Sequence, residues 1–136
     1  MIQSPLDAAL YTKLTGGTAL TSLLASATAV FNWLGPENTD PPYVVFNSQS
    51  DVPVYTLSGV AYENTIYTVK GVTLGPSAAA AGAIATQIDL ALNDQTLTIS
   101  GYTQMYMRRE QAIDYPEVVA GQRYHHRGAM YRIIAR

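Results

Sequence analysis

The stretch Tyr62–Asn93 has the sequence YENTIYTVKGVTLGPSAAAAGAIATQIDLALN, and it predicts a strand, a tight turn and a helix. Residues 62–72 are rich in Thr, Tyr, Ile and Val, which favour a pleated, half-buried strand. Gly75-Pro76 ends the strand, because proline fits poorly within a sheet but suits the first turn of a helix. Residues 78–92 follow with high helix propensity. One apolar stripe recurs along them every four residues: Ile84, Ile88 and Leu92. Neither element buries its apolar side alone, so we expect the helix to lie across a sheet that contains the strand.

Further helices and strands are predicted on both sides of this stretch. A helix is expected from Pro5, with Ser4 as its cap, and a shorter helix over residues 19–25. Strands are expected at residues 29–34, 43–47, 97–99, 102–109 and 124–134. The segment Ser48–Gly59 is polar and contains Asp51 and Pro53, so it is expected to be a long hairpin loop. Glu110–Gln122 has no clear period and includes Pro116 and Gly121, so it is also expected to be a loop. The prediction is a single α+β domain over residues 1–136, with a mainly antiparallel sheet and helices packed on one face.

Few residues are charged, and tyrosine is abundant. The charged fraction is 13%, against a usual value of about 25%, and there are ten tyrosines and no cysteine. This composition favours a surface partly covered by other subunits, with a Tyr-rich sheet core as the alternative. No apolar run approaches the roughly 20 residues of a membrane span, and the N-terminus does not resemble a signal peptide. We therefore expect no membrane association, and a cytoplasm or a particle assembled in one.

Charge is unevenly distributed along the chain. Residues 1–100 hold two lysines and seven acidic residues, whereas residues 101–136 hold six arginines and three acidic residues. Such a polarised chain favours head-to-tail contacts between copies. The net charge of −2 argues against a dedicated nucleic-acid binder.

No catalytic signature is present in the sequence. His125 and His126 are adjacent on a predicted strand, so their side chains point to opposite faces and do not readily chelate one ion. Glu110, Asp114 and Glu117 lie in a predicted loop, where a solvated or subunit-bridging role is favoured over acid–base chemistry. We expect no catalytic residue, no metal site and no cofactor.

The order and spacing of these elements resemble the tail-completion and tail-terminator proteins of long-tailed phages. The resemblance covers the whole chain and is carried by Leu6–Tyr11, Leu20–Leu24, Val30–Asn32, Pro42–Phe46, Tyr67–Val72, Ala79–Leu92 and Tyr124–Ile133. No one of these motifs is diagnostic alone. The last combines aromatic and basic residues in YHHRGAMYRI.

The resemblance implies a structural virion protein without enzyme activity. Such a protein forms a hexameric ring that caps the head-proximal end of the tail tube and ends tube polymerisation. Its partners are the major tail tube protein and a head-completion or stopper protein, and DNA passes through the lumen. The implied location is the virion, at the head-tail junction, after assembly in the host cytoplasm. Another head-tail connector ring, a small cytoplasmic ligand-binding module and a metal-dependent enzyme using His125 or His126 are the alternatives.

Two sets of residues are the predicted interaction sites. The first is a basic and aromatic subunit interface, because arginine forms partly buried ion pairs well. Its members are Arg108, Arg109, Arg123, Tyr124, Arg127, Tyr131 and Arg132. The second is a loop that contacts the tube or connector, because loops of this length are uncommon without a function. Its members are Ser48, Gln49, Asp51, Val52, Pro53 and Tyr55.

Overall fold

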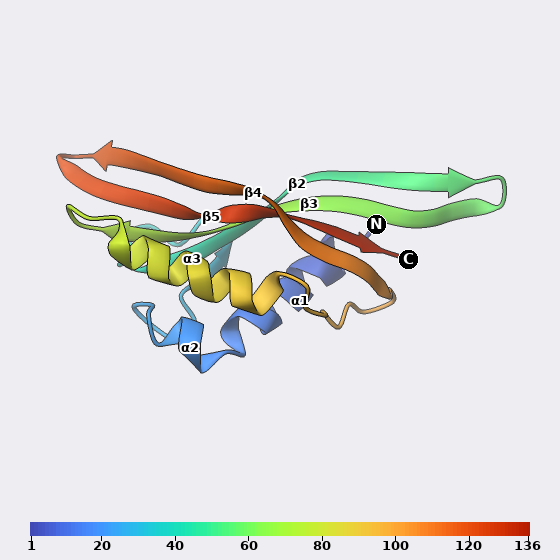
Figure 1. Cartoon of the computed structure of the whole chain (residues 1–136), viewed down its shortest axis with the longest axis horizontal. Coiled ribbons are helices and arrows are strands. Elements are labelled where there is room, and N and C mark those ends of the chain that lie inside the picture. Colours follow the sequence, from blue (N-terminus) through green and yellow to red (C-terminus); the bar gives the residue numbers. More distant parts are fainter.

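A computed structural model describes all residues 1–136 as three helices and a five-stranded sheet (Figure 1). The helices are α1 (Gln3–Thr15), α2 (Thr18–Thr21) and α3 (Ala79–Leu92). The strands are β1 (Val30–Asn32), β2 (Tyr43–Thr56), β3 (Gly59–Leu74), β4 (Gln104–Val119) and β5 (Gln122–Ala135). The strand order is β1-β2-β3-β5-β4.

The sheet is antiparallel except at one edge. β1 pairs in parallel with β2 over three residues, whereas β2–β3, β3–β5 and β5–β4 are antiparallel. The predicted α+β class and the mainly antiparallel sheet are therefore confirmed.

The helices cover one face of the sheet, as Figure 1 shows. Within the decisive stretch, the predicted stripe on α3 is confirmed, because Ile84, Ile88 and Leu92 are all buried. They pack in one core with the matching leucines of α1, namely Leu6, Leu10 and Leu14, and with the sheet residues Phe46, Tyr67 and Tyr131. Gly71 allows α3 to approach β3 closely, since an added Cβ would lie 2.9 Å from the Cβ of Ile84.

Both predicted long loops are wrong, because they are strands. Residues 48–56 continue β2 and pair with β3, and only Leu57 and Ser58 form the turn. Likewise, residues 110–119 continue β4 and pair with β5 around a turn at Ala120 and Gly121. Pro53 and Pro116 lie on strands that have an unpaired side at those positions, where a missing N–H breaks no ladder.

Two smaller predictions also differ from the structure. The predicted strand at residues 97–99 is absent, and only a single bridge joins Ile99 to Tyr102. Ser4 is not the helix cap, because α1 begins at Gln3 and no side chain caps it.

The β2–β3 hairpin extends beyond the body of the sheet. The β3–β5 ladder ends at the Glu63–Ala135 pair, and β1 accompanies β2 only as far as Phe46. Residues 52–62 therefore form a two-stranded ribbon, called the arm below. In Figure 1 the arm and the β4–β5 turn point in opposite directions along the longest axis. The two ends of the molecule are thus formed by two different hairpins.

Candidate interaction surfaces

The C-terminal arginines are mostly engaged within the chain. Arg108 pairs with Asp94 at 2.6 Å, Arg109 with Asp89 at 3.3 Å and Arg127 with Asp114 at 3.0 Å. Arg132 pairs with both carboxylate oxygens of Glu110. Arg123, at the β4–β5 turn, forms no ion pair. Four of the six arginines are therefore partly neutralised before any other copy approaches.

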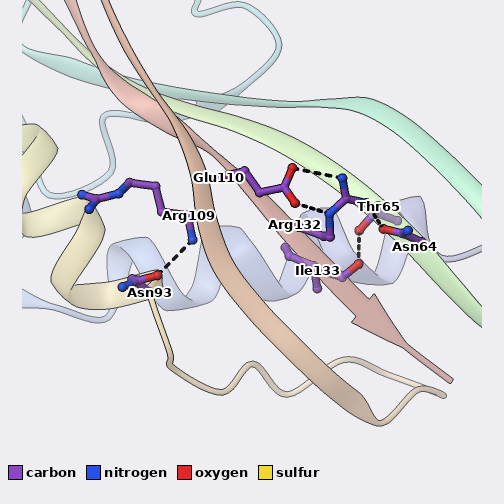
Figure 2. A network of polar contacts seen from close by, with 7 residues as sticks. All are labelled: Asn64, Thr65, Asn93, Arg109, Glu110, Arg132 and Ile133. Atoms are coloured by element: carbon purple, nitrogen blue, oxygen red, sulfur yellow. Dashed lines mark hydrogen bonds and ion pairs between the residues drawn. The ribbon is translucent and has the colours of Figure 1, made fainter.

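Arg132 organises a polar network on the sheet face opposite the helices, drawn in Figure 2. Its guanidinium donates to Glu110 on β4 and, at 2.6 Å, to Asn64 Oδ1 on β3, so it connects three strands. Its hydrogen bond holds the pKa of Glu110 below the usual value. On β4 nearby, the backbone N–H of Arg109 donates to Asn93 Oδ1 at 2.9 Å, so the end of α3 covers that part of the β4 edge.

The two tyrosines of the predicted interface have different environments. Tyr124 is half-buried, and its hydroxyl donates to Gln122 at 3.2 Å. Tyr131 is only 1% exposed and donates to Asp89 Oδ1 at 3.0 Å. The side chain of Tyr131 thus belongs to the core of its own chain.

His125 and His126 point to opposite faces, as their adjacency predicts. His125 Nε2 lies 3.0 Å from the carbonyl oxygen of Gly75. His126 is buried and stacked on Tyr115, with ring centroids 4.5 Å apart and an interplanar angle of 7°. Burial lowers the pKa of His126 and the nearby Lys70 lowers it further, while Glu117 at 3.5 Å opposes them. No group of three His, Cys, Asp or Glu side chains is placed to hold a metal ion.

The arm is an exposed apolar ribbon without a charged residue. Its sequence, residues 52–62, is VPVYTLSGVAY. Tyr55 is 68% exposed, the Leu57 side chain at the tip is fully exposed, and Val52 and Val60 are also exposed. Exposed apolar strands with open edges promote association unless a partner covers them.

The residues predicted to contact the tube or connector lie along β2. Val52, Pro53 and Tyr55 belong to the arm, and Asp51 lies at its base, where it accepts a hydrogen bond from Gln3 Nε2 at 2.9 Å. Ser48 pairs with Tyr67, and Gln49 lies at the register shift between Ser48 and Ser50. The structure thus brings Val52, Pro53 and Tyr55 together on one projection and leaves Ser48 in the body of the sheet.

A surface groove of about 690 Å³ lies between α1 and residues 96–100. Small residues form most of its wall on the helix side: Ala8, Ala9, Gly16, Gly17 and Ala91. Lys13 is its only charged residue, and no carboxylate or imidazole lies in it, so it offers no acid–base pair. None of the helices combines the length and apolar character needed to cross a bilayer.

Sequence reasoning missed Trp33 and Leu34 as candidate surface residues. They follow β1 directly and are 57% and 85% exposed. The run Trp33-Leu34-Gly35-Pro36 carries a signal, because two large apolar residues before two strand breakers are poorly placed to reach a core.

Comparison with known proteins decides the family. Residues 8–134 match the family described as "Tail completion protein gp17". The chain belongs to this tail completion family. The resemblance inferred from the order of elements is thereby confirmed, and the chain is a structural tail protein. No curated protein sequence matches it significantly.

Solved structures share the fold of this tail completion family member. A chain in the structure described as "Virion of native gene transfer agent (GTA) particle" aligns with a TM-score of 0.82. The two chains are 19% identical, and the alignment covers 99% of this chain and 98% of that one. A second solved chain is 16% identical and aligns with a TM-score of 0.59 over 98% of this chain and 96% of that chain. The fold is thus found in a chain of a gene transfer agent virion.

Proposed function

We propose that this tail completion protein caps the head-proximal end of a tail tube as a hexameric ring. The ring ends tube polymerisation and joins the tail to head-completion proteins, with DNA passing through its lumen. The protein acts without catalysis or cofactor, in the virion, after assembly in the host cytoplasm. The single observation that carries the proposal is the uncharged, exposed arm of a chain that belongs to a tail completion family.

The open edges of the sheet support association of copies around a ring. The outer side of β2 is unpaired beyond Phe46, and the outer side of β4 is unpaired in the ladders beyond residue 109. These edges lie on opposite sides of the sheet and belong to strands of opposite direction. Copies related by rotation therefore present complementary edges, which is the requirement for a closed head-to-tail ring.

The arm supports contact with the adjacent tube ring. It projects from the body, and its exposed apolar residues supply area that a partner can bury. Since it carries no charge, it docks without desolvating an ion.

The arginine interface remains a proposal. Because most of these arginines form ion pairs within the chain, exchanging the two partners of one pair can test it. Arg127→Glu places a second carboxylate beside that of Asp114. A loss of assembly in this variant would therefore also follow from repulsion within the chain. Exchanging the pair, with Arg127→Asp and Asp114→Arg, restores the internal attraction while reversing the charge presented to a neighbour. If the exchanged protein assembles like the wild type, Arg127 is not an interface residue.

Electron microscopy tests the ring directly. Purified protein at high concentration and virions assembled with it are imaged, with light scattering to give the mass in solution. A six-fold ring between tube and head is the expected result. A ring on the head side that does not touch the tube would favour a connector adaptor instead. A protein that stays monomeric and is absent from virions would overturn the proposal.

A further inference from the structure

Trp33 presents a large aromatic side chain from a strained backbone. Its φ is 70°, in the left-handed region that bulky L-residues rarely adopt. The strand pairing fixes this conformation, because Trp33 N–H donates to the carbonyl oxygen of Phe46 at 2.9 Å. The next N–H, of Leu34, turns back to the carbonyl oxygen of Asn32 at 3.0 Å. Strain of this kind persists where the surroundings impose it and concentrates at sites that bind.

The strained backbone directs two large apolar side chains towards solvent rather than into the core. Trp33 remains 57% exposed and Leu34 85% exposed. Leu34 also lines a hollow of about 350 Å³ with Pro36, Tyr43, Val119 and Tyr124. Tryptophan is enriched in interface hot spots, and Trp33 is exposed directly before the leucine that lines this hollow.

Two carboxylates follow this apolar pair in the same loop. Glu37 and Asp40 are exposed in the same loop and form no ion pair within the chain. Glu117 lines the hollow and meets only His126, whose pKa is lowered. Arg123 pairs with Val118 across the β4–β5 hairpin and therefore lies on the other face from Glu117. The loop surface, defined as Trp33, Leu34, Glu37 and Asp40, thus combines two exposed apolar side chains with two exposed carboxylates and no basic residue.

We propose that this loop surface docks a separate protein that presents an apolar pocket surrounded by lysine or arginine. Charge complementarity selects such a partner over a second copy, because four of the six arginines of this chain are already in internal ion pairs. The loop packs beside Tyr43 of β2 and Tyr124 of β5, which pair with Val72 and Leu74 at the end of β3 opposite the arm. The arm and the loop surface therefore serve different partners. The identity of the partner as a head-side protein rests on the proposed tail role. The description of the loop surface does not depend on that role.

The test uses full-length protein and two purified proteins of the same virion, the tail tube protein and the head-side connector protein. One variant combines Trp33→Asn with Leu34→Ser, because asparagine adopts the left-handed conformation with less strain. A second combines Glu37→Lys with Asp40→Lys. The matched control is Leu90→Ser, which removes a side chain that is 65% exposed on α3. Dissociation constants, unfolding midpoints and sedimentation are measured for each protein.

We expect the wild type to bind the head-side protein, and to bind it more weakly as salt screens the charges. Both double variants should bind at least about tenfold more weakly, while Leu90→Ser binds like the wild type. The Trp33→Asn, Leu34→Ser variant should unfold at or above the midpoint of the wild type, because both side chains are exposed. A lower midpoint would instead indicate that Trp33 stabilises the fold. Tube binding should not change.

Unchanged binding in both double variants, or no binding of the wild type to the head-side protein, would overturn the inference. A change in self-association instead would assign the loop surface to contact between copies and also overturn it. The tail role fails separately: tubes mixed with wild-type protein would then keep growing while head-side binding remained intact.

Discussion

Two buried tyrosines attach the two long helices to the sheet by the same device. Tyr67 on β3 donates to Asp7 Oδ1 of α1 at 2.6 Å, and Tyr131 on β5 donates to Asp89 Oδ1 of α3 at 3.0 Å. Burial raises the pKa of both hydroxyls, and the carboxylates raise it further, so both remain donors across the working pH range. Some of the tyrosines thus belong to the core of the sheet, which was the alternative to an interface role that the composition left open.

Tyr67→Phe tests this attachment. The change keeps the ring but removes the donor to Asp7, so the free energy of unfolding should fall by about 1.5–3 kcal/mol, the range for a hydrogen bond to a charged group. Urea unfolding measures it. Tyr11→Phe is the matched control, because the Tyr11 side chain is partly exposed and its hydroxyl forms no hydrogen bond within the chain. Equal losses in both variants would refute the role of the Tyr67–Asp7 bond.

His126 predicts a pH dependence of stability. Its pKa is lower in the folded chain than in the unfolded chain, where it is about 6.5, so the unfolded state binds the proton first as pH falls. Stability should therefore be lost from about pH 7 downward until the folded-state pKa is reached. His126→Phe should lose less stability over this window, measured by urea midpoints at several pH values. His125→Gln, the control, should retain the wild-type slope.

At the scale of elements, Gly71 sets the distance between α3 and the sheet. Gly71→Ala places a methyl group against Ile84 and should lower the free energy of unfolding by about 1–3 kcal/mol, as overpacking does. Gly17→Ala is the control, since an added Cβ there meets nothing within 4 Å and its φ is −102°. Thermal or urea unfolding compares the two. A Gly71→Ala protein as stable as the wild type would show that α3 moves away without cost.

Elements with one buried face were predictable, and the exposed hairpin ends were not. The stripe of Ile84, Ile88 and Leu92 has a period because one side of α3 is buried. Residues 110–119 are exposed at nearly every position, so burial imposes no alternation on them. Prolines increased the error, because sequence alone does not show that Pro53 and Pro116 fall at unpaired strand sides.

The internal pairing of the arginines was not predictable from the sequence. The charge asymmetry identified the arginine-rich segment, yet most of those arginines pair with acids that are distant in sequence, such as Asp89 and Asp94. Their pairing depends on the β4–β5 register and on the end of α3, which periodicity does not specify. Trp33 was missed because it was assigned to a strand over residues 29–34, although the breakers Gly35 and Pro36 that follow indicate that the strand ends early.

At the scale of the whole molecule, the arm should be dispensable for folding and needed for assembly. Tyr55→Asp with Leu57→Asp places charges on an exposed ribbon, so the free energy of unfolding should change by less than about 0.5 kcal/mol for each substitution. Electron microscopy should show no rings on tubes. Leu90→Asp, with a comparable exposure on α3, should leave rings intact. Normal rings in the double variant would remove the arm from the assembly surface.

β3 runs without interruption from the tip of the arm to the centre of the core, and this continuity has a mechanical consequence. Its first residues pair only with β2, whereas Tyr67, further along the same strand, is buried and bonded to α1. No loop or glycine separates the two parts, and the β2–β3 register shifts between Ser48 and Ser50 near their boundary. A force on the tip therefore acts on a strand whose longer part is held between β2 and β5 and is covered by the helices, so a partner that binds the arm also loads Tyr67.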